Sequence, residues 1–143
     1  VKGLGEILTR PSRFGMRMLL NAAFHDRSKV TSEMVEDRLR LARLPGAHAA
    51  FLSTLRGMVR LSGFHPEIIA DIQSRLPTIR QPSLVIWGLQ DRFLPNRHAQ
   101  ILERLLPNCR VAHYEACGHL PHDEHSARFN ADAAAFLGGV AAA

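Results

Sequence analysis

The sequence predicts an α/β protein, in which a helical first half is followed by the order strand, helix, strand, helix. Ser83–Trp87 is a short apolar run ended by a glycine, which is typical of a buried strand, and Arg110–Tyr114 is a second short strand. One-sided apolar patterns with helical spacing surround both segments. Because the strand, helix and strand occupy only about 35 residues, they most simply form a parallel pair with a right-handed crossover.

Length and composition limit the classes of protein that this chain can represent. The chain has 143 residues, of which 46% are hydrophobic and 22% charged, so one domain with a buried core is expected, with room for a small appendage. No apolar run approaches the ~20 residues that cross a bilayer, and the first ten residues lack a secretory pattern. We therefore expect a soluble, cytoplasmic protein with no membrane partner.

Charge and cysteine content disfavour two further classes. The net charge is +5, but the arginines are scattered and few aromatic residues accompany them, so no nucleic-acid face is expected. If such a face existed, binding to DNA would fall steeply with salt. The two cysteines, Cys109 and Cys117, form neither a dense disulfide framework nor a CxxC pair, which is typical of a reducing compartment.

The first half predicts only helices. The first carries Met18, Leu19, Ala22 and Ala23; the second follows the N-cap candidate Thr31, carries Val35, Leu39 and Ala42, and stops at Pro45-Gly46; the third carries Phe51, Leu52, Leu55, Met58 and Val59 and closes at Gly63; the fourth spans 66–76. Prolines between 77 and 82 interrupt the helical periodicity. This interruption predicts a boundary between a helical segment, 1–76, and a second part, 77–143.

The second part carries the predicted parallel pair. The first strand, 83–87, is expected to be buried on both faces. A helix then opens at Pro95, carries Ile101, Leu102, Leu105 and Leu106, and ends at Pro107-Asn108, and the second strand spans 110–114. A last helix, marked by Phe129, Ala133, Phe136 and Leu137, is expected to be capped by Gly138-Gly139.

Two polar side chains follow the predicted strands, one after each. Asp91 lies in the loop after the first strand and His119 in the loop after the second. The carboxyl ends of adjacent parallel strands share one edge at a spacing of ~4.8 Å, so a hydrogen bond between these side chains is geometrically easy. An aspartate on one imidazole nitrogen fixes the tautomer and leaves the other nitrogen as a general base. Such a pair would supply two members of a three-member catalytic arrangement, although an aspartate and a histidine in surface loops also pair by accident.

The residues around this pair resemble the carboxyl-terminal half of the α/β-hydrolase superfamily. The stretch 82–95, PSLVIWGLQDRFLP, is similar to the family's penultimate strand and acid loop, and 117–125, CGHLPHDEH, with Phe129-Asn130 is similar to its histidine loop and final helix. The residue sequences of both motifs are most similar to those of carbon–carbon bond (meta-cleavage product) hydrolases and related esterases and epoxide hydrolases. The fold class implied is a partial α/β-hydrolase fold: the last two parallel strands with flanking helices, plus a helical cap.

The resemblance also implies roles for individual residues. Asp91 would be the acid and His119 the catalytic histidine, acting on an ester or related bond of a small, largely apolar substrate without a cofactor. Residues 1–76 would correspond to the cap, which matches in pattern and not in motif. Some apolar residues of this cap would line the substrate pocket together with Phe93, Leu94 and Leu120.

The sequence departs from the family in one respect that bears on activity. None of its eight serines lies in a GxSxG nucleophile elbow, and no HGG-type oxyanion loop occurs. We therefore expect a fragment of the fold, whose attacking serine or aspartate would come from another segment and which is inactive alone. The missing amino-terminal half is then an expected partner. The alternative is a non-catalytic, truncated module that binds a partner chain supplying the rest of the sheet.

Two other arrangements of the same residues are less favoured. The spacing of His119, His122 and His125 could suggest zinc, but Pro121 interrupts a continuous helix and the resemblance explains His119 without a metal, so none is expected. Cys117 could be a thiolate nucleophile beside His119, although neighbours in sequence rarely face each other in that way.

Overall fold

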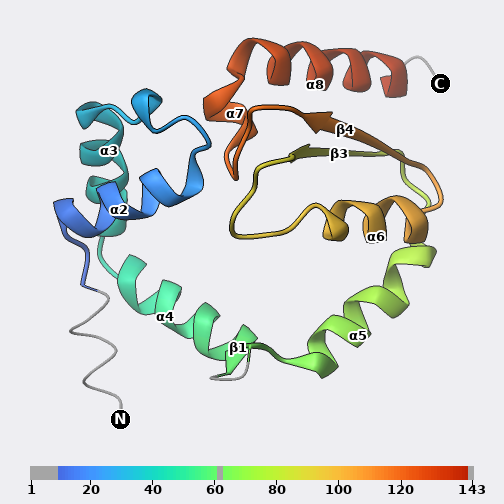
Figure 1. Ribbon diagram of the computed structural model, residues 1–143. Helices are drawn as coiled ribbons and strands as arrows, with labels where there is room; N and C mark the ends of the chain where they lie inside the picture. The colour runs from blue at the N-terminus through green and yellow to red at the C-terminus, as the bar shows by residue number, and fades with distance from the viewer. Residues whose placement is uncertain (1–9, 61–62, 142–143) are drawn as a thin grey trace.

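The computed structural model describes residues 10–60 and 63–141. Its centre is a parallel pair of strands, β3 (Ser83–Gly88) and β4 (Cys109–Tyr114), in a register that sets Ser83 opposite Cys109 and Gly88 opposite Tyr114. The helix α6 (Arg97–Leu105) covers one face of the pair, and α8 (Ser126–Ala141) covers the other (Figure 1). The predicted strand–helix–strand unit, with adjacent parallel strands, is confirmed.

The amino-terminal helices lie beyond the carboxyl ends of the two strands (Figure 1). In α2 (Arg13–Ala23), the hydroxyl of Ser12 caps the first turn by accepting the Gly15 N–H. The helix α3 (Ser32–Ala42) begins at the predicted N-cap, where Thr31 accepts the Met34 N–H at 3.1 Å. A short 3₁₀ turn, η1 (Arg27–Lys29), joins the two helices.

A small apolar core holds α2 and α3 together. It consists of the buried residues Leu20, Ala23, Phe24, Val30 and Val35, with Met16, Met34 and Leu120 packed against it. In α2 the buried residues are Leu20 and Ala23, so the predicted stripe member Ala23 is confirmed, whereas Met18 and Leu19 of the same predicted stripe are exposed. Leu120 belongs to the second part of the chain, so this core also joins the helical segment to the loop that follows β4.

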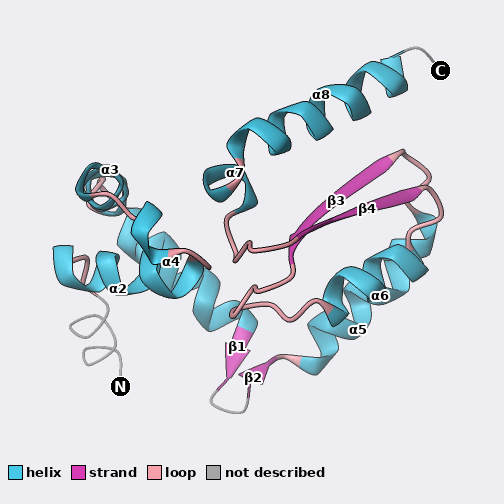
Figure 2. Ribbon diagram, turned by 45° about the horizontal axis from the view of Figure 1, so that its top comes forward, coloured by secondary structure: helices cyan, strands magenta, loops and turns pink. Residues whose placement is uncertain are grey.

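The chain then returns to the sheet through two helices that form an arc. These are α4 (Ala47–Met58) and α5 (Pro66–Arg75), which is followed by the 3₁₀ turn η2 (Leu76–Thr78) (Figure 2). The prediction that the first half contains only helices is wrong. Val59 is extended and ends α4, and β1 (Val59–Arg60) pairs antiparallel with β2 (Gly63–Phe64), so the chain turns four residues earlier than the expected stop at Gly63.

Two expectations for the second part are also corrected. The helix α8 continues through Gly138 and Gly139, because neither residue has the positive φ with which a glycine caps a helix. A separate short helix, α7 (Pro121–Glu124), precedes it. The strand β3 is only partly buried along most of its length, since one of its edges pairs with no strand in the described part of the chain.

The predicted boundary between residues 76 and 77 lies within η2, where Leu76 is buried and the helical arc ends, and the division into two parts stays a prediction. Part of the predicted helical segment, residues 1–9 and 61–62, lies outside the described residues. Within 10–60 and 63–141, no helix combines the length and apolarity needed to cross a membrane.

The small core beneath α2 makes a testable prediction about stability. Phe24 is 1% exposed, so Phe24→Ala should lower the free energy of unfolding by ~3–5 kcal/mol through lost burial and a residual cavity. Phe14, within α2, is 77% exposed, and Phe14→Ala should change the free energy of unfolding by less than ~0.5 kcal/mol. Urea unfolding followed by circular dichroism measures both, and equal effects would contradict the assigned core.

Candidate active site

The loop that follows β3 (the acid loop, 89–96) and the loop that follows β4 (the histidine loop, 115–120) are joined by backbone and side-chain hydrogen bonds. The Leu89 N–H donates to the Tyr114 carbonyl at 2.9 Å. One residue further on, the Gln90 N–H donates to the Cys117 carbonyl at 2.9 Å, and the Gln90 side-chain oxygen accepts the Cys117 N–H at 3.1 Å. Gln90 therefore fixes the position of the histidine loop relative to the acid loop.

Two glycines allow this approach. A Cβ at Gly88 would overlap the carbonyl oxygens of Cys117 and Gly118, and a Cβ at Gly118 would overlap the carbonyl oxygen of Ala23. Three segments, the end of β3, the histidine loop and the end of α2, therefore touch through their backbones. Only a residue without a side chain fits at positions 88 and 118.

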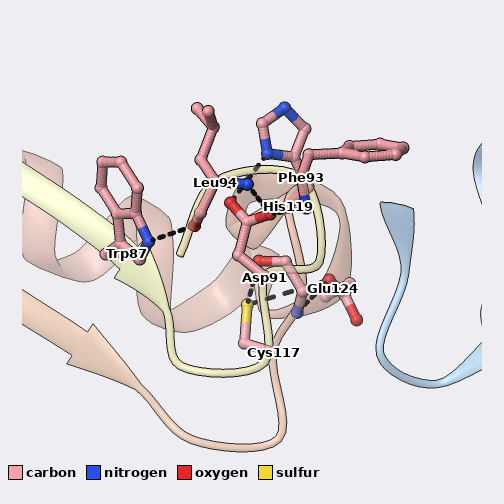
Figure 3. A network of polar contacts seen from close by, with 8 residues as sticks. Trp87, Asp91, Phe93, Leu94, Cys117, His119 and Glu124 are labelled. Atoms are coloured by element: carbon pink, nitrogen blue, oxygen red, sulfur yellow. Dashed lines mark hydrogen bonds and ion pairs between the residues drawn. The ribbon is translucent and has the colours of Figure 1, made fainter. Parts of the chain in front are cut away.

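The predicted pair meets at this junction. The Nδ1–H of His119 donates to Oδ2 of Asp91 at 2.8 Å, and the Asp91 side chain is only 6% exposed (Figure 3). The other carboxylate oxygen, Oδ1, accepts the backbone N–H groups of Phe93 and Leu94 at 2.8 and 2.9 Å. The carboxylate is thus oriented by its own loop, and it selects the His119 tautomer that carries the proton on Nδ1.

The second imidazole nitrogen is left open. In Figure 3 the Nε2 of His119 points away from the other residues drawn, and its side chain is 34% exposed. A cavity of about 160 Å³ borders the pair and is lined by Ile86, Trp87, Gly88, Asp91, Leu94, Gly118, His119 and Pro121. The indole N–H of Trp87 donates to the Leu94 carbonyl at 3.2 Å and so ties the acid loop to β3. An oriented base with a free nitrogen can take a proton from a nucleophile placed at this edge.

The three residues predicted to bind substrate occupy different surroundings. Leu94 lines the cavity. Phe93 is 42% exposed and packs edge-on against the His119 ring, with the ring centroids 5.1 Å apart. Leu120 packs against the core between α2 and α3. The substrate contacts of all three stay predictions.

The other two histidines of the HxxHxxH spacing have separate environments. The Nε2 of His122 lies 3.7 Å from Asp123, and the ring of His122 packs edge-on against Phe129. The Nε2–H of His125 donates to the Ala116 carbonyl at 3.0 Å. Within 10–60 and 63–141, no three His, Cys, Asp or Glu side chains are gathered as metal ligands would be.

Cys117 is unsuited to act as a thiolate nucleophile. The residue is fully buried, and its Sγ lies 3.8 Å from the Gly118 carbonyl and 3.9 Å from the Glu124 carboxylate. Burial, followed by the nearby Glu124 charge, raises the pKa of the Cys117 thiol to about 12. The thiol stays protonated near neutral pH.

Sequence reasoning missed one residue of this site, Glu124. Its side chain is buried, with a residue exposure of 5%, and its carboxylate accepts the N–H groups of Gly118 and His25, each at 2.7 Å. Within the polar run 122–125, an acidic residue is typical of a solvent-facing position. The sequence carries no sign of the contact with His25, which lies 99 positions away.

The comparisons with known proteins agree with this architecture. The family model described as alpha/beta hydrolase fold matches residues 11–126. The chain therefore belongs to the α/β-hydrolase fold family, and the resemblance drawn from its motifs is confirmed.

The chain is also similar to individual curated hydrolases. It is 30% identical, over 138 residues, to a 2-hydroxy-6-oxononadienedioate/2-hydroxy-6-oxononatrienedioate hydrolase of Cupriavidus pinatubonensis, covering 96% of this chain and 46% of the relative. It is 31% identical to a 2-hydroxy-6-oxo-6-phenylhexa-2,4-dienoate hydrolase of Delftia acidovorans, covering 91% and 43%. The chain spans about half the length of the curated relatives that it matches.

A solved structure gives the same picture. The meta-cleavage product hydrolase CumD superposes with a TM-score of 0.73 at 26% identity, covering 96% of this chain and 50% of that structure. The partial α/β-hydrolase fold expected from the sequence is confirmed at this level.

The close approach at Gly88 makes a prediction about the pair. Gly88→Ala should push the histidine loop away from β3 and lower the free energy of unfolding by ~1–3 kcal/mol, as overpacking does. It should also lengthen the bond between Asp91 and His119, which an NMR measurement of the His119 ring nitrogens detects. Gly138→Ala is the control, because a Cβ there meets open space on a helix and should stabilise by ~0.5–1 kcal/mol. An unperturbed His119 ring in Gly88→Ala would contradict this account.

The buried thiol makes a second prediction. With a pKa of about 12, only about one Cys117 in 10⁴ is a thiolate at pH 8, and burial blocks the reagent. In the native chain, a disulfide reagent should therefore modify Cys109, which is partly exposed, well before Cys117. Mass spectrometry of the labelled peptides, with a denatured sample as control, measures the order. Rapid native labelling of Cys117 would contradict the assigned burial.

Proposed function

We propose that this chain supplies the acid and histidine half of a hydrolase active site, and that a polypeptide outside this chain supplies the nucleophile. The observation that supports the proposal is the His119 ring, held on a buried carboxylate through Nδ1 while Nε2 faces open space. Membership of the α/β-hydrolase fold family supports it as well. Asp91 and His119 are the proposed catalytic residues.

The proposed chemistry follows from the protonation state of this pair. His119 takes a proton from the attacking hydroxyl through Nε2, and Asp91 stabilises the imidazolium that forms. The imidazolium then returns the proton to the leaving group, so the same side chain acts first as base and then as acid. Asp91 keeps its charge throughout, because its role is to orient and stabilise the ring.

We propose a small, largely apolar 2-hydroxy-6-oxo acid as substrate. The relatives are named as hydrolases of a 2-hydroxy-6-oxo dienedioate or trienedioate and of a 2-hydroxy-6-oxo-6-phenyl dienoate, and apolar residues such as Leu94 lie beside the pair. Hydrolysis adds one water across the carbon–carbon bond, so that one fragment leaves as a carboxylic acid and the carbon of the other gains hydrogen. The carbon leaving group needs a proton at that moment, and we assign this proton donation to the His119 imidazolium.

The proposal includes inactivity of the chain alone. Its sequence has no GxSxG elbow and no HGG-type loop, so His119 has no hydroxyl to activate and no donors stabilise a developing oxyanion. The strand β3 offers a place for the missing part. Its free edge pairs with no strand in the described part of the chain, and the cavity beside Asp91 and His119 lies at its carboxyl end.

A second candidate function is a non-catalytic module that binds a partner chain. The same free edge of β3 favours it, together with an apolar groove lined by Leu84, Ile86, Phe129, Ala133, Phe136 and Leu137. Backbone pairing at the edge and apolar packing in the groove would hold a partner without any chemistry. The two candidates differ in what the partner brings to His119.

The test begins with the coding sequence directly upstream of Val1. The proposal predicts an in-frame segment with a GxSxG elbow, and a protein comprising that segment and this chain should hydrolyse 2-hydroxy-6-oxo-6-phenylhexa-2,4-dienoate, followed by loss of the dienoate absorbance. Asp91→Asn and His119→Ala should each lower kcat by roughly 10³-fold or more. The chain alone should show no turnover.

The control for this experiment is His122→Ala, which removes a neighbouring, half-exposed imidazole and should leave kcat unchanged. Hydrolysis that persists in both Asp91→Asn and His119→Ala would refute the catalytic assignment. Binding of an upstream segment without any hydrolysis would favour the second candidate.

A further inference from the structure

Glu124 lies where three segments of the molecule meet. Its Oε1 accepts the Gly118 N–H from the histidine loop, and its Oε2 accepts the His25 N–H from the segment after α2. The carboxylate therefore bridges two backbone groups that are distant in sequence. Figure 3 shows it below the Asp91 and His119 pair, next to Cys117.

The peptide on the other side of Gly118 is held by the same helical segment. The His119 N–H donates to the Ala23 carbonyl at 2.7 Å. The preceding N–H, that of Gly118, donates to Glu124, which also accepts the His25 N–H. Two consecutive N–H groups of the histidine loop are therefore connected to residues 23–25, one directly and one through Glu124. The missing Cβ of Gly118 lets the loop lie against Ala23. These bonds fix the backbone that carries the imidazole independently of the bond between the ring and Asp91.

Glu124 is itself held in place. Its N–H donates to the Leu120 carbonyl at 2.9 Å, and its carbonyl accepts the Lys29 ammonium at 2.7 Å. The preceding residue, Asp123, forms an ion pair with Arg38 at 2.9 Å. Lys29 and Arg38 both belong to the helical segment, so two cations of this segment contact α7, one at the Glu124 carbonyl and one at the Asp123 carboxylate.

We propose that Glu124 is a positioning residue for the histidine of the active site, acting through the Gly118 and His25 amides and not by contact with substrate. Two properties suit it to this role. It is a buried carboxylate, which only hydrogen-bond donors can satisfy, and its two oxygens serve two different segments. Hydrogen bonds to a charged acceptor are about twice as strong as neutral ones.

The inference rests on the proposed function for its catalytic meaning, but its structural content is independent of turnover. If Glu124 sets the position of the His119 backbone, it also sets whether Nδ1 reaches Asp91. A contact that only stabilised the fold would change the unfolding midpoint and leave the His119 ring of folded molecules unaltered.

The deciding measurement is the tautomer of His119 by ¹⁵N NMR of the imidazole nitrogens in the 143-residue chain, at a pH where the ring is neutral. In the unmutated chain, Nδ1 should carry the proton. In Glu124→Gln the amide oxygen can accept one N–H, while the NH₂ group faces the other donor, so the loop should relax and the ring should become a mixture of both tautomers. Amide exchange at Gly118 should accelerate about tenfold or more, in line with the loss of a bond to a charged group.

The matched control is Glu115→Gln, which removes the same charge from an exposed position close to the same loop and should leave both signals unchanged. An unaltered His119 tautomer in folded Glu124→Gln would overturn the proposal and leave Glu124 as a purely structural contact. If Glu124→Gln does not fold, Glu124→Asp decides by the same readout, because its shorter side chain keeps the charge but cannot span both amides.

The outcome is separable from that of the proposed function. A His119 ring that loses its tautomer in Glu124→Gln supports the positioning role even where no hydrolysis is found with any upstream segment. Hydrolysis that depends on Asp91 and His119, together with an unaltered ring in Glu124→Gln, would retain the function and reject the role of Glu124.

Discussion

The close backbone approach between the end of β3 and the histidine loop is the constraint on which the site depends. Gly88 faces the carbonyl groups of Cys117 and Gly118 without a side chain between them. This close approach lets Gln90 form hydrogen bonds with Cys117. These bonds align the two loops so that Asp91 and His119 lie at hydrogen-bond distance. The parallel register of β3 and β4 brings the two loops to the same edge of the sheet, and Gly88 and Gly118 allow the close backbone contact between them.

The histidine loop is held by hydrogen bonds on two sides, and the bonding groups on the two sides differ in chemistry. On the β3 side the partners are backbone groups and the neutral amide of Gln90. On the α2 side they are a carbonyl and the buried carboxylate of Glu124. Since a buried charge is tolerated only with its donors in place, the α2 side penalises any loop position that leaves Glu124 unpaired. The helical segment thus belongs to the architecture of the site as well as lying next to it.

The parts of this structure that follow from local rules could be predicted from sequence. The runs before Gly88 and after Asn108 identify β3 and β4, and their connection through one helix makes them parallel, so the meeting of Asp91 with His119 could be predicted and is confirmed. Thr31 likewise identifies the start of α3. Predictions failed where the local signal is ambiguous: Gly138 and Gly139 resemble a cap but keep helical geometry, and Val59 continues a helical stripe but adopts an extended backbone. Glu124 could not be assigned, because its role depends on a residue 99 positions away.

The roles proposed for Asp91 and His119 account for the arrangement of the groups around them. An imidazole that moves a proton must be held at one nitrogen and free at the other, so its supports must all lie on one side. Here Nε2 of His119 stays exposed, because the groups that hold this residue lie elsewhere. They are the Asp91 carboxylate at Nδ1, the Phe93 ring against the imidazole, and the Ala23 carbonyl, which accepts the His119 backbone N–H. Asp91 meets the complementary requirement, since a carboxylate that must stay charged while 6% exposed needs several donors, and the amides of Phe93 and Leu94 provide two besides the imidazole. The groups named here that orient these two side chains all belong to this chain, so the proposed acid and base half of the site does not depend for its geometry on the polypeptide that would supply the nucleophile.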